Sequence, residues 1–225
     1  MANGKSMTKR LTIRDEGRGG LTAFSTFFFC ICLIVTGCHR DVAPVDYVLP
    51  DTVRLQSGDL AFREGESRES RAVTTLDRES QYTHVGMIVW HGGRWCVLHA
   101  VPSERATEQE EDSVKLEPIG VFFRSDRAVS GGVYRYPVTP DDTLGLLHRG
   151  LGLYYGRHPL FDNLFDAQDT TAFYCTELVC FLYQQVMGID LSEGRRHNLP
   201  LYPNLIFCSG VFKNQRLEEV FMFEK

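Results

Sequence analysis

The sequence has little of the compositional bias that marks specialised classes of protein. Seven cysteines in 225 residues are too few to hold a protein of this size together by disulfide bonds. Twenty glycines and nine prolines are ordinary numbers, which excludes collagen-like and low-complexity chains. The net charge is −5, from 24 Lys and Arg against 29 Asp and Glu, and this argues against nucleic-acid binding, which needs a clustered basic face. The chain is therefore an ordinary globular protein, 43% hydrophobic, with enough material to bury a core.

Motifs for metals and for membrane spans are also missing. The sequence has neither a Cys-x-x-Cys pair nor a His-Glu-x-x-His motif, so no metal and no cofactor is expected. The long apolar run from Leu21 to Val35 is shorter than the roughly 18 residues that a membrane-spanning helix needs. It follows a segment rich in Lys and Arg, and a basic segment before a short apolar one is typical of a secretory signal.

The apolar run ends in Val35-Thr36-Gly37-Cys38, which resembles the lipobox of bacterial lipoproteins. In that motif a cysteine after a small residue is acylated and becomes the first residue of the mature protein. The resemblance implies a lipoprotein signal peptide over residues 1–37, lipid attachment at Cys38 and a cell-envelope location. We expect the outer membrane, because no Asp directly follows the cysteine. A plain signal peptide or an uncleaved anchor helix is the alternative.

The rest of the chain is expected to be a tether over residues 38–50 and one domain over residues 51–225. Segments typical of strands come first in this domain, and segments typical of helices, 144–155 and 175–187, follow. This order indicates an α+β domain with helices packed on one face of an antiparallel sheet. The expected strands, two of them joined by a glycine hairpin turn at 91–94, are residues 59–63, 83–90, 95–101, 114–123 and 132–136.

Two histidines are predicted to share one side of this sheet. Alternation along the strand 83–90 puts His84 on the face that Ile88 also occupies, and alternation along the next strand puts His99 beside Val97. Because the two strands form a hairpin, both imidazoles can line one site. A lone histidine is more often a core or surface residue, so the pair alone predicts no chemistry.

Cys175 stands at the predicted N-terminus of the helix 175–187, on its apolar face. The helix dipole and the free N–H groups at this end stabilise a thiolate and lower the pKa of a thiol placed there. A thiolate nucleophile needs a base nearby, and the base needs a polar group that orients it. His84 and His99 can supply these two roles. The cysteines expected to be packing residues are Cys96, Cys180 and Cys208.

At these residues the chain resembles the circularly permuted papain-like hydrolases, the YiiX-like relatives of the NlpC-type cell-wall peptidases. Residues 57–63 (SGDLAFR) are similar to the family's opening Gly-Asp strand, and 83–88 (THVGMI) to its histidine strand. Residues 174–179 (YCTELV) are similar to its nucleophile helix, and His99 falls at its third polar position. The match covers Ser57 to Gly188, and a histidine before the cysteine is the order that the permutation produces.

The resemblance implies a permuted papain-like fold and a thiol hydrolase site. In that site Cys175 would be the nucleophile, His84 the general base and His99 the group that orients the base. The backbone N–H of Cys175 would form part of an oxyanion hole.

The chain departs from the family pattern shortly before the cysteine. Residues 156–162 (GRHPLFD) keep the family's Gly and Asp, but Phe161 stands where a Tyr is common. If that hydroxyl assists relatives, it is absent here, or Tyr155 or Tyr174 replaces it. Asp59 is a candidate site carboxylate, although we expect it to cap the turn that precedes its strand.

The expected function is that of a lipid-anchored cysteine peptidase or amidase of the cell envelope, acting through an acyl-enzyme on Cys175. Peptidoglycan stem peptides are the expected substrates, by family analogy. Lipid or acyl amides and esters are the alternative substrates, since the permuted group also resembles lecithin retinol acyltransferase. The apolar segment 199–212 could line a pocket for an acyl chain, or it could form a core strand. The other class of function is a binding module without activity, against which retention of Cys175, His84 and His99 argues.

Overall fold

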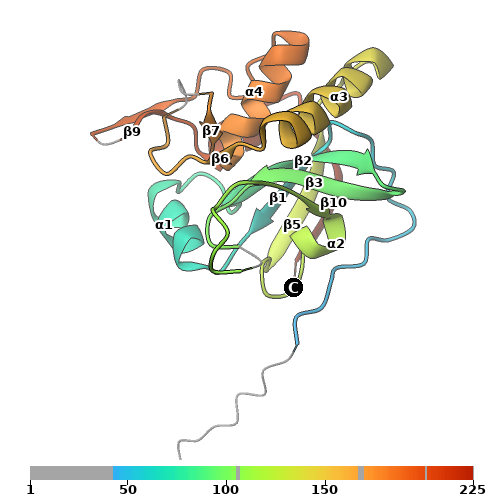
Figure 1. Cartoon of the computed structure of the whole chain (residues 1–225), viewed down its shortest axis with the longest axis horizontal. Helices are drawn as coiled ribbons and strands as arrows, with labels where there is room; N and C mark the ends of the chain where they lie inside the picture. The colour runs from blue at the N-terminus through green and yellow to red at the C-terminus, as the bar shows by residue number, and fades with distance from the viewer. Residues whose placement is uncertain (1–42, 105–106, 167–169, 201, 225) are drawn as a thin grey trace, which may run out of the picture. The chain divides into compact units, whose positions relative to one another are not determined.

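A six-stranded antiparallel sheet, in the order β10-β5-β1-β2-β3-β4, is the centre of the fold (Figure 1). The structure is a computed structural model that describes residues 43–104, 107–166, 170–200 and 202–224. The predicted signal peptide and the predicted lipid attachment at Cys38 lie outside these residues. The strands are β1 (Leu60–Glu64), β2 (His84–His91), β3 (Arg94–Ala100), β4 (Val114–Pro118), β5 (Ser130–Arg135) and β10 (Glu218–Glu224).

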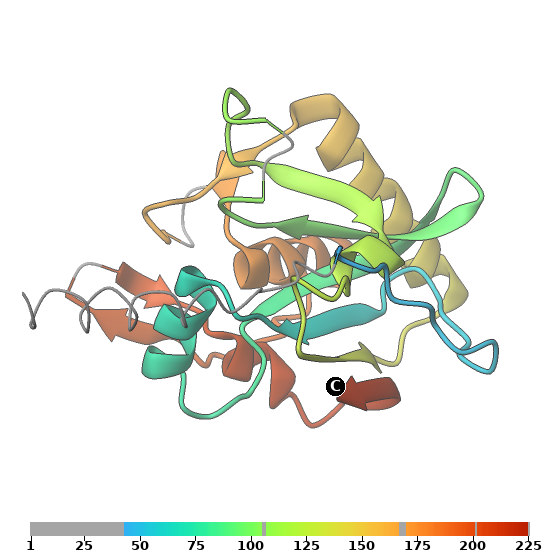
Figure 2. The ribbon, with the colours of Figure 1, turned by 90° about the horizontal axis from the view of Figure 1, so that it is seen from below.

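Two long helices, α3 (Pro140–Arg157) and α4 (Cys175–Met187), lie together over one face of the sheet (Figures 1 and 2). The larger core lies between these helices and the sheet, and it includes Met87, Leu98 and Leu178. The predicted α+β class with an antiparallel sheet is thus confirmed. The shorter elements are α1 (Arg68–Leu76), α2 (Ile119–Phe122), α5 (Cys208–Phe212), β6 (Leu160–Phe161), β7 (Ala172–Phe173), β8 (His197–Leu199) and β9 (Tyr202–Leu205).

The opposite face of the sheet has a smaller core of its own. Helix α2 contributes Phe122 to it, and the sheet contributes Ile88. Tyr47, from the segment expected to be a tether, stacks on Phe223 with ring centroids 4.1 Å apart, and its backbone N–H donates to the Gly120 carbonyl (2.9 Å). Helices therefore cover both faces of the sheet, although the sequence predicted them on one face only.

Helix α4 begins and ends at the predicted residues. The backbone N–H of Tyr174, just before the helix, donates to the Glu177 carboxylate (3.3 Å), which closes the first turn. Gly188 ends the helix at φ +68°, a left-handed conformation that glycine adopts without strain. Leu178 and Leu182 are fully buried against the sheet. Packing and caps together fix the position of Cys175 at the start of the helix.

Helix α3 begins at Pro140 and runs two residues past Tyr155, the predicted last residue of the helix. Thr139 caps its start in a reciprocal pair with Asp142, whose side chain accepts from the Thr139 backbone N–H at 3.0 Å. The helix continues through Gly156, which was expected to end it, and stops at His158, whose φ is +43°. One glycine inside a helix costs only about 1 kcal/mol, and 18 residues of packed helix offset this.

Two further predictions about the secondary structure were wrong. The expected strand 114–123 ends at Pro118 and continues as helix α2, because proline has no N–H to donate to the sheet. The segment 199–212 is not one core strand: it contains the last residue of β8, then strand β9 and then helix α5. The edge strand β10 had not been predicted.

Candidate active site

The first residue of helix α4 and the first residue of strand β2 lie next to each other, and both are candidate catalytic residues. Cys175 is the first residue of α4, and His84 is the first residue of β2. The Cys175 thiol and the His84 imidazole are joined by a side-chain hydrogen bond. His84 is buried, whereas Cys175 is partly exposed. Cys175 is thus the more exposed residue of the pair.

The two imidazoles form a second direct contact. His84 Nε2 lies 2.8 Å from His99 Nδ1 across the β2–β3 pair. The ring of Phe122, in helix α2, stacks on His84 (centroids 5.6 Å apart) and meets His99 edge to face (5.1 Å). The predicted trio of Cys175, His84 and His99 is therefore brought together in one line of contacts.

The line continues to a carboxylate that sequence reasoning missed. His99 Nε2 lies 3.1 Å from Glu117 Oε1, on strand β4. Arg127 Nη1 donates to both Glu117 oxygens, at 2.9 and 2.8 Å, and lies 3.1 Å from the Glu104 carboxylate. Glu104 also pairs with the buried guanidinium of Arg63. Beyond His99 the contacts thus continue through side chains of alternating charge, and they end at the buried Arg63.

The register of the sheet explains this placement. In the β3–β4 pair Glu117 lies opposite Val97, which shares the face of His99. The sequence does contain the signal, a Glu in a strand of otherwise mixed polarity, but it does not reveal the register with β3. Without the register, Glu117 cannot be distinguished from a surface charge.

Burial dominates the electrostatics of His84. It lowers the pKa of this imidazole to about 4, and the hydrogen bond to Cys175 opposes the shift only in part. His84 is therefore neutral near pH 7 and able to accept a proton. Burial would raise the pKa of Glu117, but the hydrogen bond to His99 and the charge of Arg127 hold it well below its usual range, so that this carboxylate is ionised.

The pKa of Cys175 is lowered by a neighbour that the sequence had suggested was only a packing residue. The hydrogen bond with the Cys208 thiol is the largest cause, burial opposes it, and His84 adds to the lowering. In turn the pKa of Cys208 is raised by Cys175 and by burial. Cys208 is therefore the donor of the pair, and Cys175 is the thiol that loses its proton first.

Two hydrogen bonds fasten Ile206, two residues before Cys208, to the start of α4. The backbone N–H of Ile206 donates to the Tyr174 hydroxyl (3.0 Å), and the Thr176 hydroxyl donates to the Ile206 carbonyl (2.6 Å). These two residues flank Cys175, so the chain just before α5 is fastened on both sides of it. No sequence motif links residues 175 and 208, and only the packing of α5 against α4 brings them together.

Other residues considered from the sequence have structural roles. The Asp59 carboxylate is fully buried, pairs with Arg135 (2.7 Å) and accepts the backbone N–H of Gln56 (2.8 Å), as expected of a turn residue. Tyr155 hydrogen-bonds to His91 (2.8 Å), at the opposite end of β2 from His84. Of the two tyrosines proposed to replace the family hydroxyl, only Tyr174 adjoins Cys175, and its hydroxyl already accepts the Ile206 N–H.

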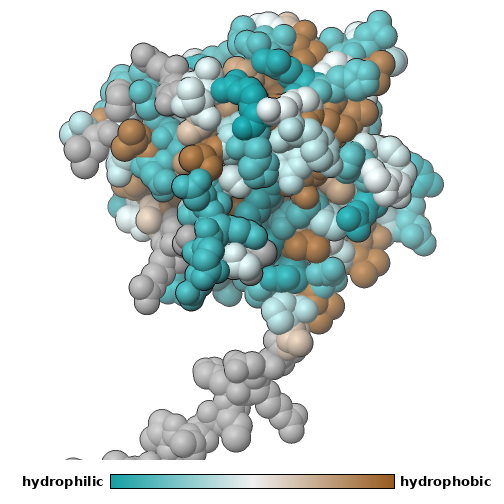
Figure 3. Space-filling model, in the orientation of Figure 1, coloured by the Kyte–Doolittle hydropathy of each residue, from teal (hydrophilic) through white to brown (hydrophobic). Residues whose placement is uncertain are grey.

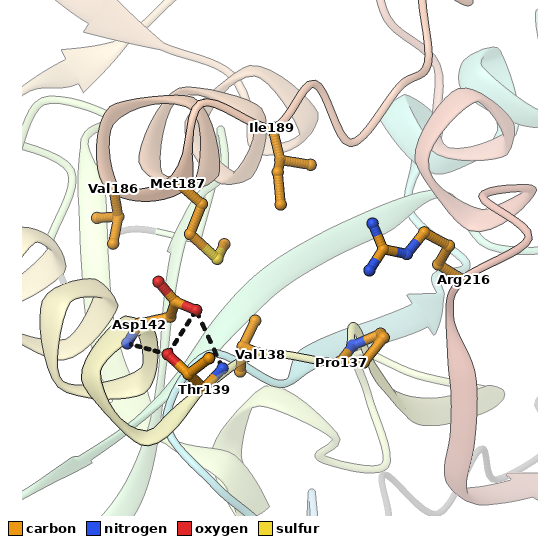
Figure 4. Close-up of a pocket in the computed structure, with 8 residues that line it drawn as sticks. All are labelled: Pro137, Val138, Thr139, Asp142, Val186, Met187, Ile189 and Arg216. Carbon is orange, nitrogen blue, oxygen red and sulfur yellow. Dashed lines mark hydrogen bonds between the residues drawn. The ribbon is translucent and has the colours of Figure 1, made fainter.

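A cavity of about 660 Å³ lies elsewhere, between the start of α3 and the end of α4 (Figure 4). In Figure 4 Val186 and Met187 point from α4 toward Thr139 and Asp142. Val186 and Met187 lie at the end of α4. At 1.5 Å of rise per residue, they are roughly 17 Å along the helix from Cys175. Asp142 caps α3 and Arg216 stacks on a tyrosine ring, so the polar groups of this cavity serve the fold.

The described part of the chain contains no group of three or more His, Cys, Asp or Glu residues arranged to hold a metal ion. Within the same residues, no helix combines the length and apolar character needed to cross a membrane. Figure 3 shows the face of Figure 1, where hydrophobic side chains occur in small groups among hydrophilic ones.

Comparisons with known proteins identify a shared fold. No protein-family model matches the sequence, and no curated protein matches it. Among solved structures, the chain is similar to the crystal structure of the metalloprotein YiiX (DUF1105) from Escherichia coli O157:H7, with a TM-score of 0.61 and 21% identity. The match covers 76% of this chain and 98% of that one. The two proteins therefore have the same fold over nearly the whole of YiiX.

Proposed function

We propose that this chain is a cysteine hydrolase of the circularly permuted papain-like type, which cleaves amide bonds through an acyl-enzyme on Cys175. The observation that carries the proposal is the line of contacts from the Cys175 thiol through His84 and His99 to Glu117. A partly exposed cysteine whose thiol has a lowered pKa, beside a neutral imidazole, has the requirements of a nucleophile and its base. The similarity in fold to YiiX is consistent with this class of fold.

The chemistry follows from these positions. His84 accepts the proton of the Cys175 thiol, and the thiolate adds to the carbonyl carbon of the substrate amide. The negative charge moves to the carbonyl oxygen, where the backbone N–H of Cys175 at the start of α4 can stabilise it. The C–N bond then breaks, and protonated His84 gives its proton to the leaving amine. Water, deprotonated by His84, hydrolyses the thioester and restores the thiol.

The residues of this site do not fit a metal ion. YiiX is described as a metalloprotein, but in this chain His84 Nε2 and His99 Nδ1 face each other in a hydrogen bond. Glu117 Oε1 is shared between His99 and Arg127, and a guanidinium beside a carboxylate repels a cation. We therefore derive no step through a metal.

We further propose peptidoglycan stem peptides as the substrates, and a lipid at Cys38 that holds the protein in the cell envelope, at the outer membrane. The lipobox-like end of the apolar run supports the anchor, and the sequence resemblance to cell-wall peptidases supports the substrate class. Transfer or hydrolysis of acyl chains is the alternative activity of the same thiol. A third possibility is a binding module, in which the site would be chemically silent.

The test is the rate at which Cys175 is alkylated as a function of pH, read by mass spectrometry, in the wild type and in His84→Ala. An unperturbed thiol titrates near pH ~8.5. We expect fast labelling at about pH 6 in the wild type and slow labelling in the variant, followed by release of amines from cell-wall peptides by the wild type alone. Equal and slow labelling of both proteins would favour the binding module.

A further inference from the structure

Glu117 lies at one end of the line of contacts, and its surroundings fix its protonation state. Arg127 donates from one nitrogen to both carboxylate oxygens, at 2.9 and 2.8 Å. Both side chains are largely buried, with 15% and 16% of their surfaces exposed. An ionised carboxylate has no proton to donate, so it can only accept a hydrogen bond from its other neighbour, His99.

This single constraint determines where the protons of both histidines lie. His99 Nε2 must carry a proton, because it is 3.1 Å from an oxygen that only accepts. A neutral His99 then has no proton on Nδ1, so Nδ1 accepts the hydrogen bond from His84 Nε2, 2.8 Å away. A neutral His84 with its proton on Nε2 has a free lone pair on Nδ1, and this is the atom left for the Cys175 thiol.

We infer that Glu117 is a positioning residue of the proposed reaction: clamped by Arg127, it sets the tautomers of His99 and His84 and thereby presents His84 Nδ1 as the acceptor for the Cys175 proton. The inference rests on the proposed function for its catalytic meaning, and on the contacts alone for the tautomers. Without an ionised Glu117, His99 can carry its proton on Nδ1 and donate to His84. His84 would then hold its proton on Nδ1 and could not act as the base.

A purely structural role for Glu117 makes a different prediction. The Glu117–Arg127 pair also joins strand β4 to the segment before β5, and its loss would lower stability in either case. The substitution Glu117→Gln keeps the shape but removes the charge, and its amide can face His99 with either oxygen or nitrogen. It therefore separates the setting of protons from the packing.

The experiment measures histidine tautomers by long-range ¹H–¹⁵N NMR in the Cys175→Ser background, in which no thiol can transfer its proton to His84. We expect the Nε2–H form for both histidines, and a mixture of forms after Glu117→Gln. In proteins that keep Cys175, Glu117→Gln should slow its alkylation at pH 7 by roughly tenfold or more. The matched control is Asp126→Asn, which removes a carboxylate paired with Arg124 outside the line of contacts and should change neither result.

A proton on Nδ1 of His99 in the protein with Glu117 intact would overturn the inference, and this measurement needs no folded Glu117 variant. Unchanged tautomers and unchanged alkylation in Glu117→Gln would overturn it as well. Failure of the proposed function is separately visible: the wild type would hydrolyse no amide, while the tautomers would still be as inferred.

An independent observation concerns the second thiol. Cys208 is buried, its thiol is hydrogen-bonded to that of Cys175, and both cysteines are free. The hydrogen bonds of Ile206 with Tyr174 and Thr176 hold the chain two residues before Cys208 against the residues on either side of Cys175. Since Cys175 is the more exposed of the two, an oxidant meets it first.

We propose that Cys175 and Cys208 form a reversible disulfide when a peroxide reaches the site. The Cys175 thiolate attacks one peroxide oxygen, the O–O bond breaks, and Cys175 becomes a sulfenic acid while hydroxide leaves. The Cys208 sulfur then attacks the Cys175 sulfur, the S–O bond breaks, and water leaves as the S–S bond forms. The two thiols lose two electrons, which reduce one hydrogen peroxide to two waters. The disulfide blocks the nucleophile until a dithiol reduces it.

The test treats the wild type and Cys208→Ala with hydrogen peroxide and identifies the products by mass spectrometry of peptides. We expect a linked 175–208 peptide in the wild type, with free Cys175 restored by dithiothreitol. In Cys208→Ala we expect sulfinic acid at Cys175, which dithiothreitol does not reverse. Cys180→Ala, a second buried cysteine in α4, is the control that should behave as the wild type. The same amount of sulfinic acid in wild type and Cys208→Ala would overturn the proposal, whether or not the protein hydrolyses amides.

Discussion

His84 and His99 meet nitrogen to nitrogen, with Nε2 of one 2.8 Å from Nδ1 of the other. Two imidazoles in this arrangement share one proton position, so the tautomer of each depends on the tautomer of its neighbour. The tautomer of His84, the base of the proposed reaction, is therefore controlled by Glu117. This residue lies two contacts away, on the edge strand β4.

We expect Cys175→Ala to abolish hydrolysis of any substrate that the wild type cleaves, with little change in melting temperature. Cys175 is a partly exposed residue at the first position of α4, and the change removes a single sulfur atom, so little core packing is lost. The measurement is a rate assay beside a thermal unfolding curve. Turnover that persists in this variant would contradict the assignment of the nucleophile.

Labelling with a limiting amount of iodoacetamide at pH 7 should be confined to Cys175. Burial raises the pKa of Cys180 to about 12 and also raises the pKa of Cys208, so both remain neutral thiols. Peptide mapping reads the site of modification. Early labelling of Cys180 would show that the surroundings of Cys175 and Cys180 do not distinguish the two thiols.

The free energy of unfolding should fall as the pH is lowered from 7 to 5. Burial lowers the pKa of His84 to about 4 from its ordinary value of 6.5, so the unfolded state binds the proton first. The stability contributed by neutral His84 is present above pH 6.5 and is lost toward pH 4, with a loss of about 2 kcal/mol at pH 5.

Urea unfolding at pH 7 and pH 5 measures this loss, and His84→Gln should reduce it. The control is His148→Gln, at an exposed position of α3, which should keep the wild-type difference between the two pH values. An equal pH dependence in the wild type and His84→Gln would show that other groups cause it.

Gly86→Ala should both destabilise the protein and slow the alkylation of Cys175. A Cβ at this position would lie 2.4 Å from Val97 Cγ1 and 2.8 Å from His99 Cβ, so His99 must shift away from its partners. Overpacking of this kind costs roughly 1–3 kcal/mol. Gly152→Ala is the matched control, since no atom lies within 4 Å of its Cβ and alanine favours the helix.

Urea unfolding and the alkylation rate at pH 7 are measured for both glycine variants. Gly152→Ala should be as stable as the wild type or more so, and its thiol should react at the wild-type rate. If Gly86→Ala alkylates as fast as the wild type, the position of His99 does not control the thiol.

The parts of the site that a local pattern encodes could be predicted from the sequence. Cys175 is marked by the start of an apolar helical stripe, and His84 and His99 are marked by alternation in two strands that a glycine turn joins. Glu117 and Cys208 have no such mark. Their roles depend on the register of β4 and on the packing of α5, which are tertiary facts.

The same distinction explains the secondary structure. The ends of α4 were predictable because an apolar stripe begins at Cys175 and a glycine follows its last residue. Pro118 marks the end of β4, but the helix after it was not predictable, because the apolar residues that follow suit a buried strand and a short helix equally well and the second core decides between them. His158 ends α3 in a left-handed conformation that sequence patterns assign to glycine or asparagine.

The position of Glu117 on β4 also sets how the protein loses function under stress. Strands at the side of a sheet open locally at a lower free energy than the centre does, while the remaining fold stays intact. Opening of β4 would separate Glu117 from His99 and leave β1, β2 and β5 paired. In mild denaturant, fast alkylation of Cys175 and native circular dichroism should therefore separate: the thiol loses its reactivity while the protein is still folded.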